Sequence, residues 1–157
     1  MAYVANVIRD FKVEDFETLW RIDQACFPPG IAYSKTELRT YIRHRNSFTL
    51  VAEDNDRLGG FIVGHHGPIG HIITIDVIAE ARRTGVGSLL LAAAEERLRQ
   101  SGSKAVGLET AVDNASALTF YKRHGYSVVR TWPRYYSNGV DALVMKKDLA
   151  KESHRVQ

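Results

Sequence analysis

The chain has 157 residues, which suits one domain of ordinary size. Apolar residues make up 45% and charged residues 25%, which is typical of a soluble globular protein. No apolar run approaches the ~20 residues that span a bilayer, and the first residues lack the basic-then-apolar pattern of a signal peptide. Cys26 is the single cysteine, which excludes an internal disulfide, fits a cytoplasmic location and favours a packing role over a nucleophile.

The positive charge of the chain is small and dispersed. Its formal net charge is +3, and adjacent basic residues form the separate pairs Arg82-Arg83, Lys122-Arg123 and Lys146-Lys147. No signature of an RNA- or DNA-binding module accompanies them, so we do not expect a nucleic-acid partner. A weak positive field can equally attract an anionic small molecule.

Residues 1–45 predict a strand followed by two helices. Apolar side chains recur at helical spacing after residue 12, and Pro28-Pro29-Gly30 ends that pattern. Ser34 followed by Glu37 has the spacing of a capping box, which begins the second helix. The expected elements are the strand Tyr3–Phe11, the helix Val13–Cys26 and the helix Ser34–Arg45.

The middle of the chain predicts three consecutive strands. Asp54-Asn55-Asp56 is a tight-loop signal between the first two. The third run is β-branched and nearly continuous, so we expect a buried central strand. The three strands are expected over Phe48–Glu53, Leu58–Gly64 and His71–Ile78.

The remainder predicts two helices among three strands. Val86–Gln100 carries one apolar stripe, and Asn114–His124 is a short helix closed by Gly125. Asn138-Gly139 is the turn signal before the last strand. The strands are expected over Lys104–Val112, Tyr126–Trp132 and Val140–Lys146. The order β-α-α-β-β-β-α-β-α-β-β predicts a mixed α/β sheet in one domain, residues 1–149, with a polar tail at 150–157.

A glycine-rich turn between a strand and a helix is the first segment that suggests chemistry. It reads Arg82-Arg83-Thr84-Gly85-Val86-Gly87-Ser88. The first amides of a helix lack partners and lie at the positive end of its dipole, and glycines let a phosphate approach them. The spacing is not that of a dinucleotide-binding or P-loop motif. From this segment alone, a pyrophosphate cradle and a plain glycine-rich turn both remain open.

The spacing Arg82-x-x-Gly85-x-Gly87, between a strand and an amphipathic helix, resembles the acetyl-CoA signature of the GNAT superfamily of N-acetyltransferases. The resemblance implies a mixed, mostly antiparallel sheet of about seven strands flanked by about four helices. It implies acetyl-CoA as cosubstrate, with the pantetheine arm along Ile75, Asp76 and Val77. The phosphates are then expected at the backbone of Arg83, Thr84, Gly85, Val86, Gly87 and Ser88. Ala79 stands where the family often has proline.

A second segment is similar to the family's box around a catalytic tyrosine. It reads Asn114-x-x-Ala117-x-x-Phe120-Tyr121-Lys122-x-x-Gly125-Tyr126. The resemblance implies that Tyr121 protonates the departing thiolate and that Asn114 contacts the cofactor arm. From the residues alone, an amphipathic helix with an asparagine N-cap and a buried aromatic pair explains the segment equally well.

Glu109 is the candidate general base. Side chains alternate across a strand, so Glu109 shares its face with Ala105, Gly107 and Ala111, and these small neighbours leave room for a ligand. The alternative is a solvent-facing glutamate on an edge strand. Glu109 precedes Tyr121 by twelve residues. This spacing resembles the ribosomal-protein alanine acetyltransferases, the RimI-like branch, and implies that Glu109 is the base.

Two adjacent tyrosines near the end suggest a peptide channel. Tyr135-Tyr136, followed by Gly139 and Asp141, resembles the ending of N-terminal acetyltransferases, although Val140 replaces the usual acidic residue. A Phe-Pro pair also matches the RimI-like branch, whereas the segment after it departs from the family pattern. The residues expected to contact the substrate are Phe27, Tyr33, Tyr135 and Tyr136. From the residues alone, these tyrosines could also be ordinary aromatic residues of a hairpin.

The six histidines form no metal-binding pattern, so we expect no metal cofactor. His65-His66 are expected to have a surface or loop role, and no role is assigned to His71.

The motifs together predict an acetyl-CoA-dependent N-acetyltransferase. Glu109 would deprotonate the amine through a water, and the N–H of Val77 would polarise the thioester carbonyl. The tyrosines favour the N-terminus of a protein or peptide as partner, ribosomal proteins included. A lysine or small-amine acetyltransferase stays open, as does a catalytically silent acetyl-CoA-binding module. The presence of both Glu109 and Tyr121 argues against the silent module.

Overall fold

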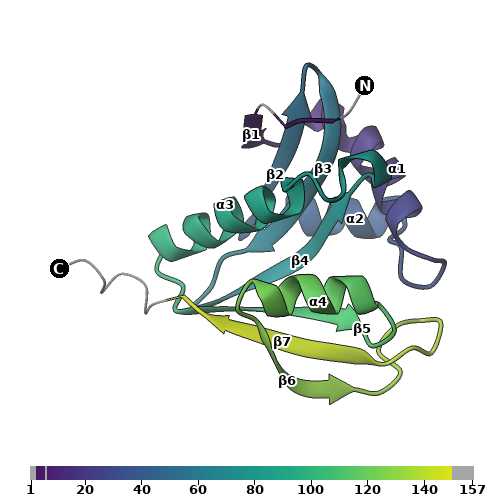
Figure 1. Ribbon diagram of the computed structural model, residues 1–157, viewed down its shortest axis with the longest axis vertical. Coiled ribbons are helices and arrows are strands. Elements are labelled where there is room, and N and C mark those ends of the chain that lie inside the picture. The colour runs from purple at the N-terminus through teal and green to yellow at the C-terminus, as the bar shows by residue number, and fades with distance from the viewer. Residues whose placement is uncertain (1–2, 6, 150–157) are drawn as a thin grey trace.

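The computed structural model of the protein describes residues 3–5 and 7–149 (Figure 1). The elements follow one another in the predicted order, and the predicted tail at 150–157 lies outside the described residues. The strands are β1 (Val7–Asp10), β2 (Ser47–Asp54), β3 (Arg57–His65), β4 (Ile69–Val77), β5 (Ala105–Ala111), β6 (Ser127–Trp132) and β7 (Ala142–Asp148). The helices are α1 (Phe16–Cys26), α2 (Lys35–Arg43), α3 (Val86–Gln100) and α4 (Ala115–Arg123).

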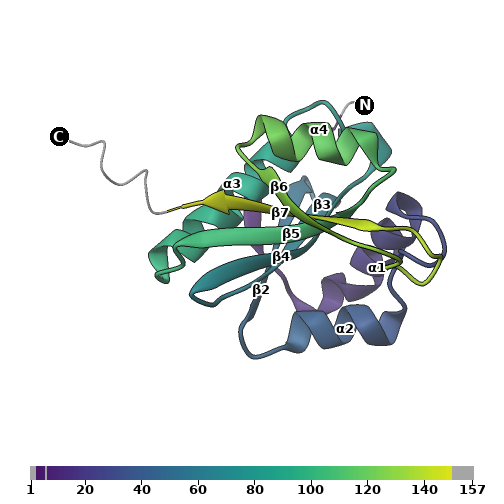
Figure 2. The same cartoon turned by 90° about the horizontal axis from the view of Figure 1, so that it is seen from below.

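All seven strands belong to one sheet in the order β1-β2-β3-β4-β5-β7-β6. Every neighbouring pair is antiparallel except β4 and β5. Helices α3 and α4 lie on one face of the sheet, and α1 and α2 lie on the other (Figure 2). Each face buries its own apolar core, one under α3 and α4 and one under α1 and α2. The predicted mixed, mostly antiparallel fold is therefore confirmed.

The sheet divides between its two central strands. Strands β4 and β5 pair at only three positions, which are Ile69↔Ala105, Gly70↔Val106 and His71↔Gly107. Beyond His71 and Gly107 the two strands separate, and Figure 1 shows them diverging toward the ends of α1 and α4. We call this point of separation the fork. Past the fork the backbone of β4 has a strand neighbour on one side only.

Burial along β4 corrects part of the prediction made for this strand. It is central in the sheet as expected, but its side chains alternate between buried and half-buried. The half-buried positions past the fork, such as Ile75 and Val77, border the space that β5 leaves open. A β-branched run therefore indicated a central strand correctly, but the sequence could not show that its neighbour separates from it.

A β-bulge in β4 determines which side chains face α1. The register shifts between Gly64↔Ile72 and Val63↔Thr74, so Ile73 has no partner of its own on β3. Ile72 packs into the core under α3, whereas Asp76 lies opposite Phe61, which belongs to the core under α1. The bulge thus turns Asp76 toward α1.

The N-terminal region differs from the prediction in two details. Tyr3 does not extend the first strand: its buried ring lies over Gly59, where a Cβ would come within 2.3 Å of the ring, and its hydroxyl donates to the carbonyl of Ala52 at 2.8 Å. A short 3-10 turn, Val13–Asp15, precedes α1, because the Asp15 carboxylate accepts the N–H of Lys12 at 2.8 Å.

The predicted capping box at the start of α2 is confirmed. Ser34 Oγ accepts the N–H of Glu37 at 3.0 Å, and Glu37 Oε1 accepts the N–H of Ser34 at 2.8 Å. Such a cap contributes about 0.5 to 2 kcal/mol to stability. It also ends the segment 27–33, which carries two of the predicted substrate residues.

Candidate active site

The turn before α3 presents free backbone amides. Arg83 and Gly85 adopt left-handed conformations, with φ of 66° and 89°. Gly85 is the N-cap of α3, and no side chain of the described residues caps the helix. The N–H groups of the first turn therefore have no intrahelical partner and lie at the positive end of the dipole. The loop 82–85 is exposed, so an anion can reach these amides.

Arg82, the first residue of the motif, holds this turn against β4. Its Nε donates to the carbonyl of Val77 at 3.1 Å, and the Cys26 thiol donates to the same oxygen at 3.4 Å. Burial raises the pKa of Cys26 to about 11, and the negative charge of Asp76 adds to the effect. The thiol therefore stays protonated and acts as a packed hydrogen-bond donor, which agrees with the predicted packing role.

The N–H groups of Ile75 and Val77 point toward the fork. The N–H of Ile78 donates to the carbonyl of Gly59 at 2.9 Å, which makes this a hydrogen-bonded pair. Bonded and non-bonded pairs alternate along an antiparallel ladder, and Val77 lies opposite Gly60. The amide of Val77 therefore faces away from β3, into the space that β5 leaves open. The direction of the backbone N–H alternates along the strand, so the backbone of Asp76, between Ile75 and Val77, hydrogen-bonds to β3.

Tyr121 is brought to the fork by α4. Its ring is 7% exposed and packs edge-on against Phe120 and Tyr126. Among the described residues its hydroxyl has no hydrogen-bond partner. Burial raises its pKa, and interaction with the acidic groups of Asp76 and Tyr136 raises it further. The hydroxyl therefore stays protonated over the working pH range and is available to donate.

Asn114 and Ser88 make contacts that fix the helices around the fork. Asn114 caps α4, with its Oδ1 accepting the N–H of Ala117 at 3.2 Å. Ser88 Oγ lies 2.9 Å from Nε2 of His124, which joins the start of α3 to the end of α4. The N-cap reading of Asn114 is thus confirmed.

Glu109 lies at the fork with His71 as its partner. His71 Nε2 is 2.8 Å from Glu109 Oε1, and the two side chains are 40% and 17% exposed. An ionised carboxylate only accepts hydrogen bonds, so Nε2 carries the proton and donates it. In neutral His71, Nδ1 is then left as an acceptor. Glu109 is therefore neither an isolated nor a fully solvated side chain, and the reading as a solvent-facing edge glutamate is wrong.

Four tyrosines form a cluster that extends to Glu109. The rings of Tyr33 and Tyr41 are 5.1 Å apart, and those of Tyr135 and Tyr136 are 4.9 Å apart. Burial raises the pKa of Tyr135, and interaction with the acidic groups of Glu109 and Tyr41 raises it further. Tyr135 and Tyr136 therefore lie near Glu109, and Tyr33 and Tyr41 are connected to them through Tyr135.

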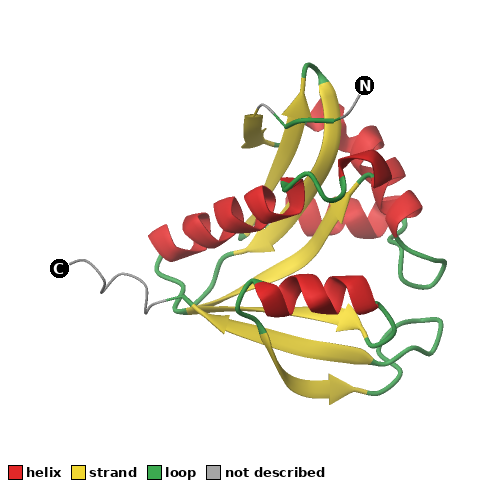
Figure 3. Cartoon of the chain, in the orientation of Figure 1, coloured by secondary structure: helices red, strands yellow, loops and turns green. Residues whose placement is uncertain are grey.

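The segment after α1 contacts the loop between β6 and β7, and both are green loops on the same side of the molecule in Figure 3. Ser137 Oγ donates to the carbonyl of Gly30 at 3.0 Å. Tyr33 and Tyr135 therefore belong to walls that touch each other. Phe27 is half-buried at the start of the same segment. All four predicted substrate residues thus lie on these two segments.

Sequence reasoning missed two residues of this site, His71 and Tyr41. His71 reaches Glu109 because β4 and β5 pair in parallel just before the fork. Parallel pairing joins segments that are far apart in the chain, and neither segment carries a signal for the other. Tyr41 reads as an ordinary helix residue. The sequence offered no pattern that could have singled it out.

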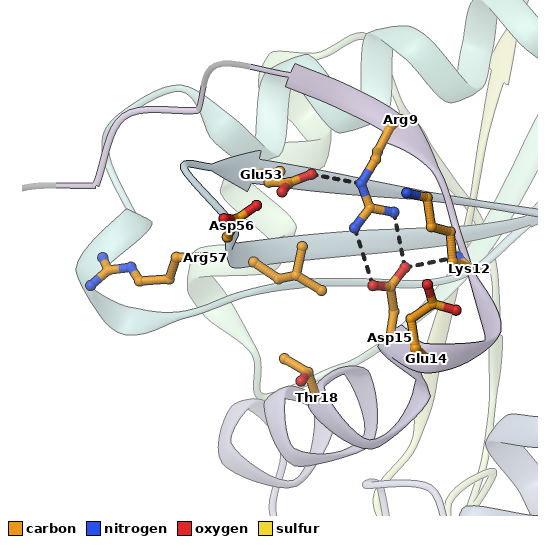
Figure 4. Close-up of a pocket in the computed structure, with 9 residues that line it drawn as sticks. Arg9, Lys12, Glu14, Asp15, Thr18, Glu53, Asp56 and Arg57 are labelled. Atoms are coloured by element: carbon orange, nitrogen blue, oxygen red, sulfur yellow. Dashed lines mark hydrogen bonds and ion pairs between the residues drawn. The ribbon is translucent and has the colours of Figure 1, made fainter.

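A polar pocket lies elsewhere, at the β1–β2 edge of the sheet (Figure 4). Its central group is Arg9, which donates to Asp15 at 2.9 Å and to Glu53 at 2.6 Å. The lining side chains belong to Arg9, Lys12, Glu14, Asp15, Thr18, Glu53, Asp56, Arg57 and Leu58. Arg9, Asp15 and Glu53 already neutralise one another, so we assign this pocket a structural role.

Within residues 3–5 and 7–149, no three His, Cys, Asp or Glu side chains gather as a metal site. None of the helices that the structure describes is both long and apolar enough to cross a bilayer.

Known proteins similar to this chain cover most of its length. A model of the acetyltransferase (GNAT) family matches residues 16–126. The N-alpha-acetyltransferase of Sulfurisphaera tokodaii is 35% identical over 159 aligned positions, which cover 90% of this chain and 92% of that protein. The crystal structure of Ard1 from Thermoplasma volcanium superposes with a TM-score of 0.86 at 30% identity, covering 94% of this chain and 100% of that one.

The ribosomal-protein-S18-alanine N-acetyltransferase from Escherichia coli superposes with a TM-score of 0.81 at 20% identity, covering 96% of this chain and 98% of that one. This likeness concerns the fold alone, so the finer resemblance to the RimI-like branch stays a prediction. The family model covers the turn before α3, the fork and α4, where the predicted motifs lie. The chain belongs to the GNAT family of acetyltransferases.

Proposed function

We propose that this protein transfers the acetyl group of acetyl-CoA to the α-amino group at the N-terminus of a protein or peptide. The observation that carries the proposal is the Glu109–His71 pair, which lies at the fork within a wall of tyrosines. The relatives named N-alpha-acetyltransferase and Ard1 support the same substrate class.

Acetyl-CoA would enter from the face of α3 and α4. The free amides of the α3 first turn suit its pyrophosphate, since they offer hydrogen bonds at the positive end of a helix dipole. The outward N–H groups of Ile75 and Val77 suit the pantetheine arm and the thioester carbonyl. Asn114 would contact the same arm. When bound, acetyl-CoA supplies an activated acetyl group as a thioester.

The peptide would enter from the face of α1 and α2. Phe27, Tyr33, Tyr135 and Tyr136 would form the walls of its channel, and the first amine would lie beside Glu109. This arrangement brings the amine to the fork from one face and the thioester from the other. Holding both substrates in one cleft supplies much of the rate, because it converts a bimolecular encounter into a positioned reaction.

The amine must be neutral to attack. At pH 7 about a tenth of an α-amino group is neutral, against about 0.04% of a lysine side chain. Glu109 and the free Nδ1 of His71 offer two acceptor sites for the amine proton, directly or through a water. The nitrogen forms a bond to the acetyl carbon, and the bond from that carbon to sulfur breaks. The hydroxyl of Tyr121 donates its proton to the departing sulfur.

We further propose that residues 1–149 form one catalytic domain, that no metal takes part and that the protein acts in the cytoplasm. The single cysteine, held as a protonated thiol, fits a reducing compartment. Ribosomal proteins are candidate substrates, in line with the predicted RimI-like resemblance.

The deciding experiment measures thiol release from acetyl-CoA with three matched peptides. The first has a free N-terminus and no lysine, and the second has a blocked N-terminus and two lysines. In the third, both the N-terminus and the lysine side chains are blocked. We expect the first to react and the other two to stay at background. Equal rates for the first and second peptides would favour a lysine acetyltransferase, and no release with any peptide or small amine would favour a silent acetyl-CoA-binding module.

A further inference from the structure

Two carboxyl groups that the proposed chemistry does not use meet in the interior. Asp23 lies on α1 and Asp76 on β4, and their side chains are 0% and 1% exposed. Asp23 Oδ2 accepts the N–H of Tyr33 at 2.7 Å, and Asp76 Oδ1 accepts the hydroxyl of Thr74 at 2.5 Å. The remaining oxygens, Asp23 Oδ1 and Asp76 Oδ2, have no donor among the described residues. The two carboxyl groups interact with each other, and the interaction with Asp23 raises the pKa of Asp76.

Two carboxylates can share a hydrogen bond only if one of them carries a proton. No lysine or arginine of the described residues forms an ion pair with either group, so no cation offsets a second negative charge. Burial raises the pKa of both groups, and contact with Asp23 raises that of Asp76 further. The charged or titratable groups facing the pair are Cys26 of α1, Tyr33, Glu37 of α2, Tyr121 of α4, and Arg82, whose guanidinium contacts the Cys26 thiol.

The pair is connected directly to the predicted peptide wall. The backbone N–H of Tyr33 donates a hydrogen bond to Asp23. Its carbonyl accepts hydrogen bonds from Trp20 Nε1 at 3.2 Å and from Gln24 Nε2 at 2.6 Å. Its hydroxyl donates to the carbonyl of Ile73 at 3.4 Å, on the bulge of β4. Tyr33 is therefore fixed only while α1 and β4 keep their present distance. The interaction of Asp23 with Asp76 is a polar contact between these two elements, beside the hydrogen bond from the Cys26 thiol to the carbonyl of Val77.

We propose that Asp23 and Asp76 share a single proton and act as positioning residues, which hold Tyr33 in the peptide wall, so that loss of the proton weakens peptide binding. This inference rests on the proposed peptide substrate. With the proton, the two groups form one hydrogen bond between α1 and β4. Without it, two negative charges face each other in an apolar interior, and α1 must move away from β4 or water must enter. Acetyl-CoA binding should change little, because the side chain of Asp76 points away from α3.

The linkage between this proton and stability has a definite sign. The carboxyl of an unfolded aspartate has a pKa of about 3.9. Because the pKa of Asp76 is raised in the folded protein, the folded state binds more protons above that value. The contribution to stability is fully present below the unfolded pKa and is lost as pH rises through the folded pKa. The melting temperature should therefore fall with pH from about pH 4 upward.

The first test compares melting temperatures of the wild type and Asp76→Asn from pH 5 to 10. The asparagine keeps the shape, accepts from Thr74 and donates its amide to Asp23 without needing a shared proton. We expect the variant to melt higher at pH 8 by about 3 °C or more, with a difference that grows with pH. This readout does not depend on any enzymatic activity, so it separates failure of the inference from failure of the proposed function.

Glu95→Gln is the matched control. Glu95 is also buried, at 6% exposure, but it accepts from Lys147 at 2.9 Å and from Tyr126 at 2.7 Å. Its replacement leaves the half-buried ammonium of Lys147 without its partner, so this variant should melt lower than the wild type. An Asp76→Asn variant that melts as low as this control, with no pH-dependent gain, overturns the shared proton.

The second test measures KM for the free peptide and for acetyl-CoA between pH 6 and 10. In the wild type, the peptide KM should rise with pH by about fivefold more than in Asp76→Asn. The acetyl-CoA KM should follow the same profile in both, because the substitution keeps the backbone of Asp76, which pairs with β3. Asp76→Ala, which leaves the Asp23 oxygen unpaired, should raise the peptide KM at every pH, and asparagine should restore it. Identical peptide KM profiles in wild type and Asp76→Asn overturn the positioning role even if the melting data support the proton.

Discussion

The turn before α3 and the surface around Glu109 lie on opposite sides of the fork, and they use different parts of the chain. The turn is one continuous segment, residues 82–88, and what it offers a ligand is backbone N–H groups. The surface around Glu109 uses side chains from β4, β5, α2 and two loops. The first site depends on the conformation of a short segment. The second depends on where distant segments meet.

This difference has consequences for mutation. A backbone site tolerates most side-chain changes and is damaged by groups that fill the space before the amides or that forbid a left-handed conformation. A side-chain site loses function with single atoms, because the proton acceptor or donor is itself removed. Substitutions on the two sides should therefore separate cofactor binding from proton transfer.

The largest effect is expected for Glu109→Gln, which preserves size but removes the carboxylate. Turnover should fall by about 10³-fold, within the range of a positioned general base. The loss should shrink at high pH, where more of the peptide amine is already neutral. Acetyl-CoA affinity, measured by calorimetry, should stay unchanged. A uniform loss at all pH values would mean that Glu109 does not serve in proton removal.

Tyr121→Phe should have the next largest effect. The ring packing against Phe120 and Tyr126 is kept, and only the unpartnered hydroxyl is lost. We expect a fall in turnover of about 10²-fold with little change in acetyl-CoA affinity, measured by single-turnover thiol release. Wild-type turnover in this variant would assign protonation of the sulfur to water or another group.

His71→Ala should lower turnover less than Glu109→Gln. A hydrogen bond to a charged group is worth about 1.5 to 3 kcal/mol, so the expected loss is about tenfold or more. His71→Gln, whose amide can still donate to Glu109, is the matched variant, and partial recovery would identify an orienting role. Full loss in both variants would instead identify Nδ1 of His71 as the acceptor of the amine proton.

Gly87→Val should weaken acetyl-CoA binding by about tenfold while turnover at saturation changes little, because the valine methyl groups occupy space before the first-turn amides. A Cβ at Gly87 meets Phe120 at 3.4 Å, an ordinary contact, so Gly87→Ala serves as the control that keeps the fold. Equal calorimetric affinities in the valine variant and the wild type would contradict the phosphate cradle.

The smallest effect is expected for Tyr136→Ala, which removes one ring from the peptide wall. Loss of about 1 kcal/mol of aromatic contact should raise the peptide KM by about fivefold, with acetyl-CoA affinity intact. Steady-state kinetics with the free peptide checks this. A larger effect on turnover than on KM would move Tyr136 from the channel wall to the reacting groups.

Much of the fold could be predicted because its signals are local. The capping box of Ser34 and Glu37, the apolar stripe of α3 and the turn at Asn138-Gly139 each act within a few residues, and the observed elements follow the predicted order. The family could be predicted for the same reason, since the motif Arg82-x-x-Gly85-x-Gly87 is continuous in the chain. The boundaries shifted by a few residues where tertiary contacts decided them, as for Tyr3 over Gly59.

Patterns that are local in the chain were enough to predict the element order, the family and the residues that can carry chemistry. Which of these residues contact one another depends on how the strands and helices pack. The partnership of Glu109 with His71 follows from a parallel pairing of three residues, and the contact of Asp23 with Asp76 follows from a bulge that turns one side chain toward α1. Pairing across a sheet joins residues that are far apart in the chain, and each segment alone is compatible with many partners.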